Sequence, residues 1–185
     1  GRVSGEGVLQ SGDALPRLNM NMAVENVDLS WLLPMREAEN WNEGQLRWAL
    51  FGRSNADIQL RAINSRFGPI MLDNLSGRLK LTEGVLEAPE VTLNLLGGTM
   101  TANVLAEGGF LTPRFAINAQ FAEINPTSLI AAQYGNALVD APVSGSLMLE
   151  GRGSSARAVM AALSGELNFE ISPGNLTFFD AVGFA

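Results

Sequence analysis

The 185-residue sequence contains neither cysteine nor histidine. The lack of cysteine excludes disulfides and thiol nucleophiles, and the lack of histidine excludes histidine-based triads and proton shuttles. Zinc sites built from these side chains are excluded as well. A cysteine-free chain fits both the cytosol and an oxidising compartment such as the periplasm, so cysteine usage does not locate the protein.

Lysine is almost absent, since Lys80 is the only lysine among twelve basic residues. The arginines are scattered singly, and no basic stripe follows a phosphate backbone, so we expect no nucleic-acid partner. The net charge of -7 favours solubility. No run reaches the roughly 18 apolar residues of a membrane span. Because strand-like segments lie at both ends, we expect the chain to be a piece of a longer protein.

Catalytic signatures are weak. The stretch Gly151–Ser155 resembles a phosphate cradle, but it lacks the third glycine of a dinucleotide fingerprint and the Gly-Lys-Ser/Thr of a P-loop. A turn from a strand into a helix capped by serine explains it better. The carboxylate pairs Glu37/Glu39 and Glu87/Glu90 could serve sugar hydrolysis, but they resemble solvated loop charges. We therefore expect no enzyme, no cofactor and no metal site.

Strand patterns dominate what is present. Apolar residues alternate with polar ones over 18–25 and alternate with smaller or polar ones over 115–122, the period of two expected of a sheet with one buried face. Turn residues such as Glu83-Gly84 and Gly97-Gly98 separate such segments. The pattern predicts a mainly β, antiparallel sheet made of hairpins. Further predicted strands are Leu46–Phe51, Ile58–Ile63, Ile70–Leu72, Leu79–Leu81, Val91–Leu95, Met100–Leu105, Leu147–Leu149, Leu167–Ile171 and Leu176–Phe179.

About three short helices interrupt the strands. They are predicted at 28–33, 125–133 and 154–163, with Asp28, Asn125 and serine as N-caps. Gly165 lies just beyond the third and is interpreted as its stop signal. Trp31, Trp41 and Trp48 lie near the first helix; packing a helix onto the sheet is the favoured role, and an interfacial aromatic belt is the alternative.

The sequence contains two copies of one pattern. Pro16-Arg17 matches Pro113-Arg114 at an offset of 97, and Leu75-Ser76-Gly77 matches Leu163-Ser164-Gly165 at an offset of 88. We predict two β-repeat units, 1–86 and 87–185, that together form one continuous sheet. Each Leu-Ser-Gly is interpreted as the place where the chain begins its next strand.

Large apolar residues lie at alternating positions of many strands, with few helices to cover them. Such a sheet must fold over on itself, close as a sandwich, or leave an apolar trough suited to acyl chains. The candidate groove residues are Leu79, Leu81, Phe115, Ile117, Phe121, Leu147, Leu149, Leu167, Phe169 and Ile171. Apolar residues on both sides of the strands would favour a groove, and one-sided strands would favour a scaffold.

Several motifs, taken in order, resemble the periplasmic C-terminal region of the AsmA-like family of Gram-negative envelope proteins. They are Asn74–Leu81, Leu95–Thr99, Asn125–Leu129 and the run from Gly151 through the alanine-rich helix to Leu163–Leu167 and Pro173–Leu176. The resemblance covers almost the whole chain, from about Val3 to Ala181.

The resemblance implies a curved, repeat-built β-groove on the periplasmic side of the inner membrane, attached through an N-terminal anchor that this chain lacks. It implies a non-enzymatic role in outer-membrane biogenesis, with phospholipid acyl chains conducted along the groove. The alternative function is a scaffold that assists the assembly of outer-membrane proteins through contacts between strand edges. The family supplies no catalytic residues.

Overall fold

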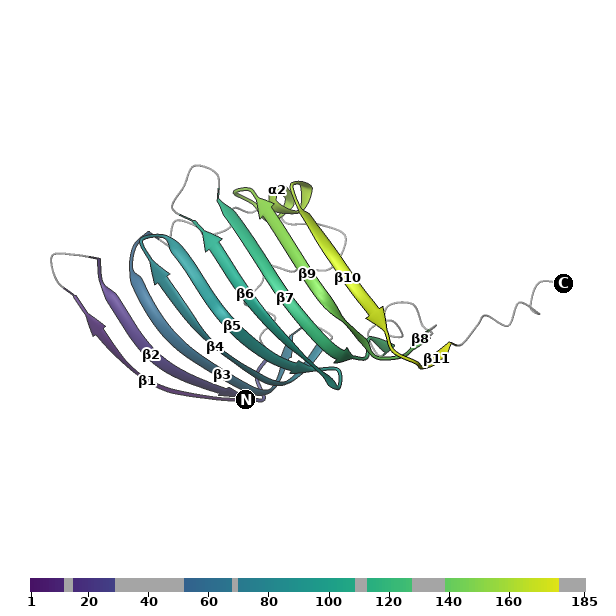
Figure 1. Ribbon diagram of the computed structural model, residues 1–185. Coiled ribbons are helices and arrows are strands. Elements are labelled where there is room, and N and C mark those ends of the chain that lie inside the picture. The colour runs from purple at the N-terminus through teal and green to yellow at the C-terminus, as the bar shows by residue number, and fades with distance from the viewer. Residues whose placement is uncertain (12–14, 29–51, 68–69, 109–112, 128–138, 177–185) are drawn as a thin grey trace.

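The protein is built around one open sheet of nine strands. The computed structural model describes residues 1–11, 15–28, 52–67, 70–108, 113–127 and 139–176, and its strand order is β1-β2-β3-β4-β5-β6-β7-β9-β10 (Figure 1). The strands are β1 Arg2–Gln10, β2 Arg17–Glu25, β3 Asn55–Phe67, β4 Ile70–Thr82, β5 Val85–Leu95, β6 Gly98–Glu107, β7 Arg114–Ile124, β9 Val143–Arg152 and β10 Ser164–Ile171. The prediction of a mainly β fold is therefore confirmed.

Almost every neighbouring pair in the sheet is antiparallel. The exception is β2 with β3, which run parallel from Arg17 beside Asn55 to Glu25 beside Ile63. Here the prediction of hairpins throughout is wrong. A parallel pair needs a crossover of a dozen residues or more, and residues 26–54 supply that length. A small second sheet pairs β8 (Val139–Asp140) with β11 (Asn175–Leu176).

The strands are longer than the sequence predicts. The segments predicted separately at Ile70–Leu72 and Leu79–Leu81 belong to the single strand β4, so Leu75-Ser76-Gly77 lies mid-strand and does not begin one. At Gly77, a Cβ would lie 3.1 Å from the Val91 side chain, so this glycine allows close packing within the sheet. The predicted strand Leu46–Phe51, and Leu176–Phe179 beyond its first residue, lie outside the described residues.

One of the predicted helices is described, α2 at Ala156–Ala161 between β9 and β10. Ser155 is its N-cap and accepts a hydrogen bond from the backbone N–H of Ala158 at 3.1 Å, as the sequence predicts. Gly165 does not stop this helix, because the C-cap is Ala162 and Gly165 lies within β10. The predicted helices at 28–33 and 125–133 lie mostly outside the described residues, although Asn125 Oδ1 accepts the Thr127 N–H at 3.0 Å as a cap would.

Two hairpins have the same register at the repeat offset. Gln10 pairs with Arg17 in the first, and Glu107 pairs with Arg114 in the second, each residue 97 positions further along. The correspondence stops there, since β3 is parallel to β2 whereas β9 is antiparallel to β7. The predicted boundary after residue 86 falls inside β5.

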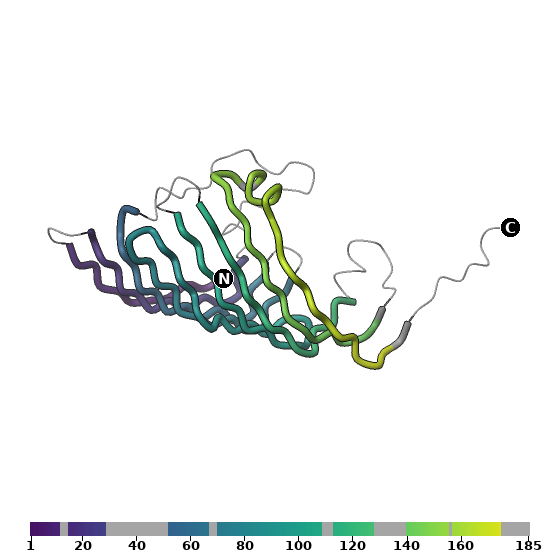
Figure 2. Tube along the Cα trace, turned by 45° about the horizontal axis from the view of Figure 1, so that its top comes forward, coloured from purple at the N-terminus to yellow at the C-terminus, as the bar shows by residue number. Residues whose placement is uncertain are grey.

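A row of irregular positions crosses one end of the sheet. Asn26, Asn64 and Glu123 have positive φ angles of 53°, 48° and 56°. The pairing register shifts between Leu72 and Asn74 of β4 and between Phe121 and Ile124 of β7. Bulges bend strands and increase their twist. Figures 1 and 2 show bowed strands that turn towards one side near this end.

The buried core lies at the same end. Val24, Ala62, Leu72 and Leu95 form it, and partly buried side chains from both sides of the irregular row pack against it. Those beyond the row include Val27, Ile70 and Ile124, and those before it include Leu60 and Leu75. One cluster thus joins side chains from both sides of the irregular row.

Candidate functional site

One face of the nine-stranded sheet is apolar at almost all of its described strand residues, and we call it the apolar face. Cross-strand partners share a face, so the pairing registers assign the paired positions. The exception is Ser65 of β3, which pairs with Leu72 and is fully buried. The other assigned positions carry only Gly, Ala, Val, Leu, Ile, Met or Phe: 3, 5, 7, 9, 18, 20, 22, 24, 56, 58, 60, 62, 70, 72, 75, 77, 79, 81, 86, 88, 91, 93, 95, 98, 100, 102, 104, 106, 115, 117, 119, 121, 124, 143, 145, 147, 149, 151, 165, 167, 169 and 171.

All ten candidate groove residues lie on the apolar face. Leu79 and Leu81 come from β4, Phe115, Ile117 and Phe121 from β7, Leu147 and Leu149 from β9, and Leu167, Phe169 and Ile171 from β10. The strands are one-sided, which is the pattern that the sequence analysis expects of a scaffold and not of a groove. That criterion does not separate the two functions, because only the face that lines a groove needs to be apolar.

Glycines on the apolar face stand opposite large side chains. Gly151 is opposite Phe115, and a Cβ there would lie 2.5 Å from the Phe115 ring and 3.0 Å from Val159 of α2. Gly145 is opposite both Phe121 and Phe169. Gly151 therefore makes room for the Phe115 ring and for Val159 of α2, whereas Gly145 allows the backbone of β10 to approach closely. The contact with Val159 places α2 over one end of β9.

Exposure on the apolar face rises from the central strands to the outer ones. Ala62 and Ala119 are buried, whereas Leu9 of β1 is 69% exposed and Phe169 of β10 is 59% exposed. The large side chains of β7 and β9 are half-buried. Within the described residues, α2 and the core cluster cover parts of this face and leave the rest open.

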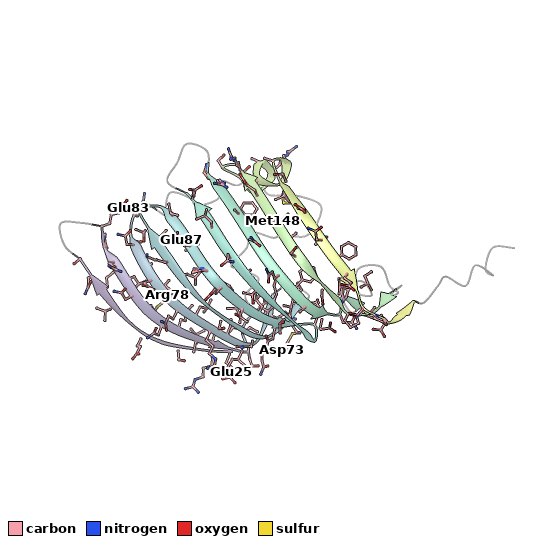
Figure 3. The ribbon with its side chains drawn as sticks, viewed as in Figure 1. Glu25, Asp73, Arg78, Glu83, Glu87 and Met148 are labelled. Carbon is pink, nitrogen blue, oxygen red and sulfur yellow. The ribbon has the colours of Figure 1, made fainter. Side chains whose placement is uncertain are left out.

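The opposite face is polar, and we call it the polar face. Arg78, Glu87 and Met148 lie on it together (Figure 3). The Asp57 carboxylate accepts two hydrogen bonds from Arg78, at 2.7 and 2.6 Å, and these hold the pKa of Asp57 below its ordinary value.

A second ion-pair cluster joins β7 and β9. The Glu150 carboxylate accepts hydrogen bonds from Arg152 and Arg114, and both lower its pKa. Arg114 Nη1 also lies 3.6 Å from Glu107 of β6. Charged groups in the strands are thus confined to the polar face, where they stay hydrated or paired.

Replacing Asp57 by asparagine tests the first ion pair. A lowered folded-state pKa stabilises the fold above the ordinary aspartate pKa of about 4, and this contribution is lost as the pH falls through the lowered value. Asp57→Asn should therefore lower the melting temperature at pH 7 by about 1–3 °C, as for an exposed pair, and the difference should vanish near about pH 2. Thermal melts across this pH range, with Asp73→Asn as the control, measure it; an equal effect of both variants contradicts the assignment.

A hollow of about 770 Å³ opens on the polar face between β5 and β10. Leu105, Ala116 and Met148 form its apolar part, and Glu87 and Glu166 are among its polar walls. Carboxylates and open access to water make it a poor site for an acyl chain. The apolar face is therefore the better candidate site.

The remaining sequence candidates are three tryptophans, two carboxylate pairs and the stretch Gly151–Ser155. Trp31, Trp41, Trp48, Glu37 and Glu39 are outside the described residues. Glu87 and Glu90 are exposed on β5, and the backbone N–H of Glu90 donates to Asn103 Oδ1 at 3.1 Å. Gly151–Ser155 is the predicted strand-to-helix turn. Among the described residues, no group of three or more acidic side chains could hold a metal ion.

Comparison with protein-family models, curated proteins and solved structures gives no match to this chain. In the part of the chain that the structure describes, no helix has the length and apolar character needed to cross a membrane.

Proposed function

We propose that this chain is a non-enzymatic lipid-binding module whose apolar face holds phospholipid acyl chains in a curved β-groove. One observation carries the proposal: among the described residues the apolar face extends across all nine strands with no charged side chain and no exposed polar one, since Ser65 is buried, while the other face carries the charges. A face of this composition is unfavourable in water and marks an interaction site.

The size of the face suits acyl chains. Strands spaced about 4.8 Å apart give a surface roughly 38 Å long across the sheet, and four or five positions per strand give it a width of roughly 20–27 Å. Each methylene removed from water contributes about 0.8 kcal/mol. Among the described residues, the hydroxyl that lies on this face, that of Ser65, is buried and donates to the Ile63 carbonyl. The face should therefore recognise acyl chains and not one particular headgroup.

The concave shape of the groove is inferred from the bend. Side chains before and beyond the irregular row pack into one cluster on the apolar face, which supports a sheet bent around that face. The equal registers of the hairpins β1/β2 and β6/β7 support lengthening of the sheet by repetition. A bent sheet reduces the contact of bound chains with water along the groove.

We further propose that the module belongs to an AsmA-like protein anchored in the inner membrane, lies on its periplasmic side and takes part in outer-membrane biogenesis. The support is the ordered set of motifs given above, together with a mainly β sheet that carries the ten groove residues on one face. Lipid transport along the groove would then follow from binding that is sustained across neighbouring strands.

The alternative is a scaffold that pairs with the strand edges of outer-membrane proteins. The specific observation in its favour is that, in the part of the chain that the structure describes, β1 and β10 each have one unpaired edge. This function requires no bound lipid, which separates it from the groove.

Native mass spectrometry of the purified chain tests the proposal. We expect the chain to carry co-purified phospholipid, with mixed headgroups because no headgroup is selected. Re-addition of phospholipid to delipidated protein should restore the bound form. Absence of bound lipid in both preparations contradicts the groove and leaves the scaffold as the better function.

A further inference from the structure

The two outer strands of the sheet combine an unpaired edge with exposed apolar side chains. On the apolar face, the large side chains that are exposed all belong to these two strands: Val3 (63%) and Leu9 (69%) on β1, and Leu167 (55%), Phe169 (59%) and Ile171 (48%) on β10. Within the described ranges neither strand has a neighbour on its outer side, so a further strand placed there would cover these side chains.

The outer strands carry few of the features that normally block pairing. Edges are usually protected by charged side chains, above all lysine, by proline, by bulges or by inward-pointing charges. β1 and β10 contain no lysine and no proline, and their charged residues lie on the polar face. β1 pairs with β2 over nine residues without a register shift, and β10 pairs with β9 over eight. Both edges are therefore regular and, among the described residues, open to a further strand.

The two edges are complementary in direction. Following the pairing around the sheet, β10 runs antiparallel to β1. If β1 of a second copy lies beside β10, the new pair is antiparallel and the two apolar faces can join on the same side. We propose that copies of this chain associate head to tail through β10 of one copy and β1 of the next.

The packing rule within the sheet selects the register. Glycines of the apolar face stand opposite large residues, as Gly5 and Gly7 face Met22 and Met20. One register extends this rule to the new pair and uses all eight residues of β10. It places Ile171 opposite Val3, Phe169 opposite Gly5, Leu167 opposite Gly7 and Gly165 opposite Leu9 of the next copy.

The polar face agrees with this register. It places Asn168 opposite Glu6, Glu166 opposite Val8, Glu170 opposite Ser4 and Ser164 opposite Gln10, so no like charges meet. A shift of two residues would place Glu166 directly opposite Glu6, which is unfavourable for a cross-strand pair.

The association is heterologous, because different strands of the two copies meet. It continues the apolar face from one copy to the next and leaves a free β1 and a free β10 at the two ends. It does not depend on lipid binding, so it can be tested in delipidated protein and can fail while the proposed lipid function stands.

Cross-linking of two single-cysteine variants tests the pairing. Because the chain has no cysteine, a short bismaleimide reacts only with an introduced thiol. Glu6→Cys and Asn168→Cys both replace exposed residues on the polar face. On a denaturing gel, a mixture of the two variants should give a cross-linked species of twice the chain mass. Each variant alone should give no cross-linked species. The pairing is overturned if the mixture gives no cross-linked dimer, or if one variant alone gives as much cross-linked dimer as the mixture.

A charge pair at Val8 tests the register. Val8 is 58% exposed, so Val8→Glu and Val8→Lys should both leave the fold intact. In the proposed register residue 8 stands opposite Glu166 of the neighbouring copy. Val8→Glu should therefore weaken association about two- to fivefold, and Val8→Lys should not weaken it. Sedimentation velocity over a concentration series, with circular dichroism as the folding control, measures the difference. Equal association of the two variants overturns the register. A chain that is monomeric at every concentration overturns the proposal and would leave the two edges for another protein.

Discussion

Replacing Phe169 by aspartate is expected to reduce lipid contact on β10 by about tenfold. Phe169 is 59% exposed on the apolar face, so its replacement removes little packing from the folded chain. When acyl chains displace the water around an unpaired carboxylate, the loss of hydration costs several kcal/mol of binding free energy. A cost of about 1.4 kcal/mol already lowers the affinity by a factor of ten. The measurement is photo-cross-linking of phospholipid from a photoreactive residue at position 167.

The control for this variant is its neighbour along the strand. Asn168 is exposed on the polar face, so Asn168→Asp adds the same charge one residue away without entering the groove. Lipid cross-linking from position 167 should be unchanged in this control. If both variants reduce it equally, a general effect of charge explains the result and the apolar face has no special role.

Replacing Ala119 by aspartate is expected to destabilise the fold strongly. Ala119 is 1% exposed at the centre of β7, between Ala102 of β6 and Leu147 of β9. A buried carboxylate without a partner there should lower the free energy of unfolding by roughly 3–5 kcal/mol, a large share of the about 5–15 kcal/mol of a typical domain. In urea this lowers the unfolding midpoint by about 1.5 M or more.

Gln120 provides the matched control for Ala119. It is the next residue of β7, exposed on the polar face. Gln120→Asp should change the free energy of unfolding by no more than about 0.5 kcal/mol. Urea titrations followed by circular dichroism compare the two variants. Similar midpoints would mean that Ala119 is not enclosed by the sheet.

The composition of the apolar face could be predicted because alternation is a local property. Side chains on a strand point to opposite faces with a period of two, so Phe115, Ile117 and Phe121 share a face whichever strands lie beside them. The same reasoning places Leu167, Phe169 and Ile171 together. Which of these sets would meet depends on strand order, and the registers of β7, β9 and β10 supply it.

The errors arose where one residue type has several uses. Glycine ends helices, makes turns and allows close packing between strands, and sequence alone does not separate these roles. Gly77 and Gly165 were assigned to a strand start and a helix stop, whereas Gly77 packs mid-strand against Val91 and Gly165 lies in β10 close to Met148. The parallel pairing of β2 with β3 could not be predicted, because it depends on the path of a long connection.

The row of irregular positions could not be predicted from the sequence patterns either. Asn26, Asn64 and Glu123 are far apart in the chain, and their alignment becomes visible only when the strands are in register. Their residue types are weak indicators of positive φ, because among these types it is common only for asparagine. The bend and the core beneath it are therefore properties of the assembled sheet.

A photo-cross-linking scan along β10 tests the central claim most directly. A photoreactive residue is introduced singly at each position from 166 to 171 of the purified chain, which is then incubated with phospholipid vesicles. If acyl chains bind the apolar face, positions 167, 169 and 171 should cross-link to phospholipid, and positions 166, 168 and 170 should not. Equal cross-linking at all six positions, the opposite alternation, or none at any position would contradict an acyl-chain groove on this face.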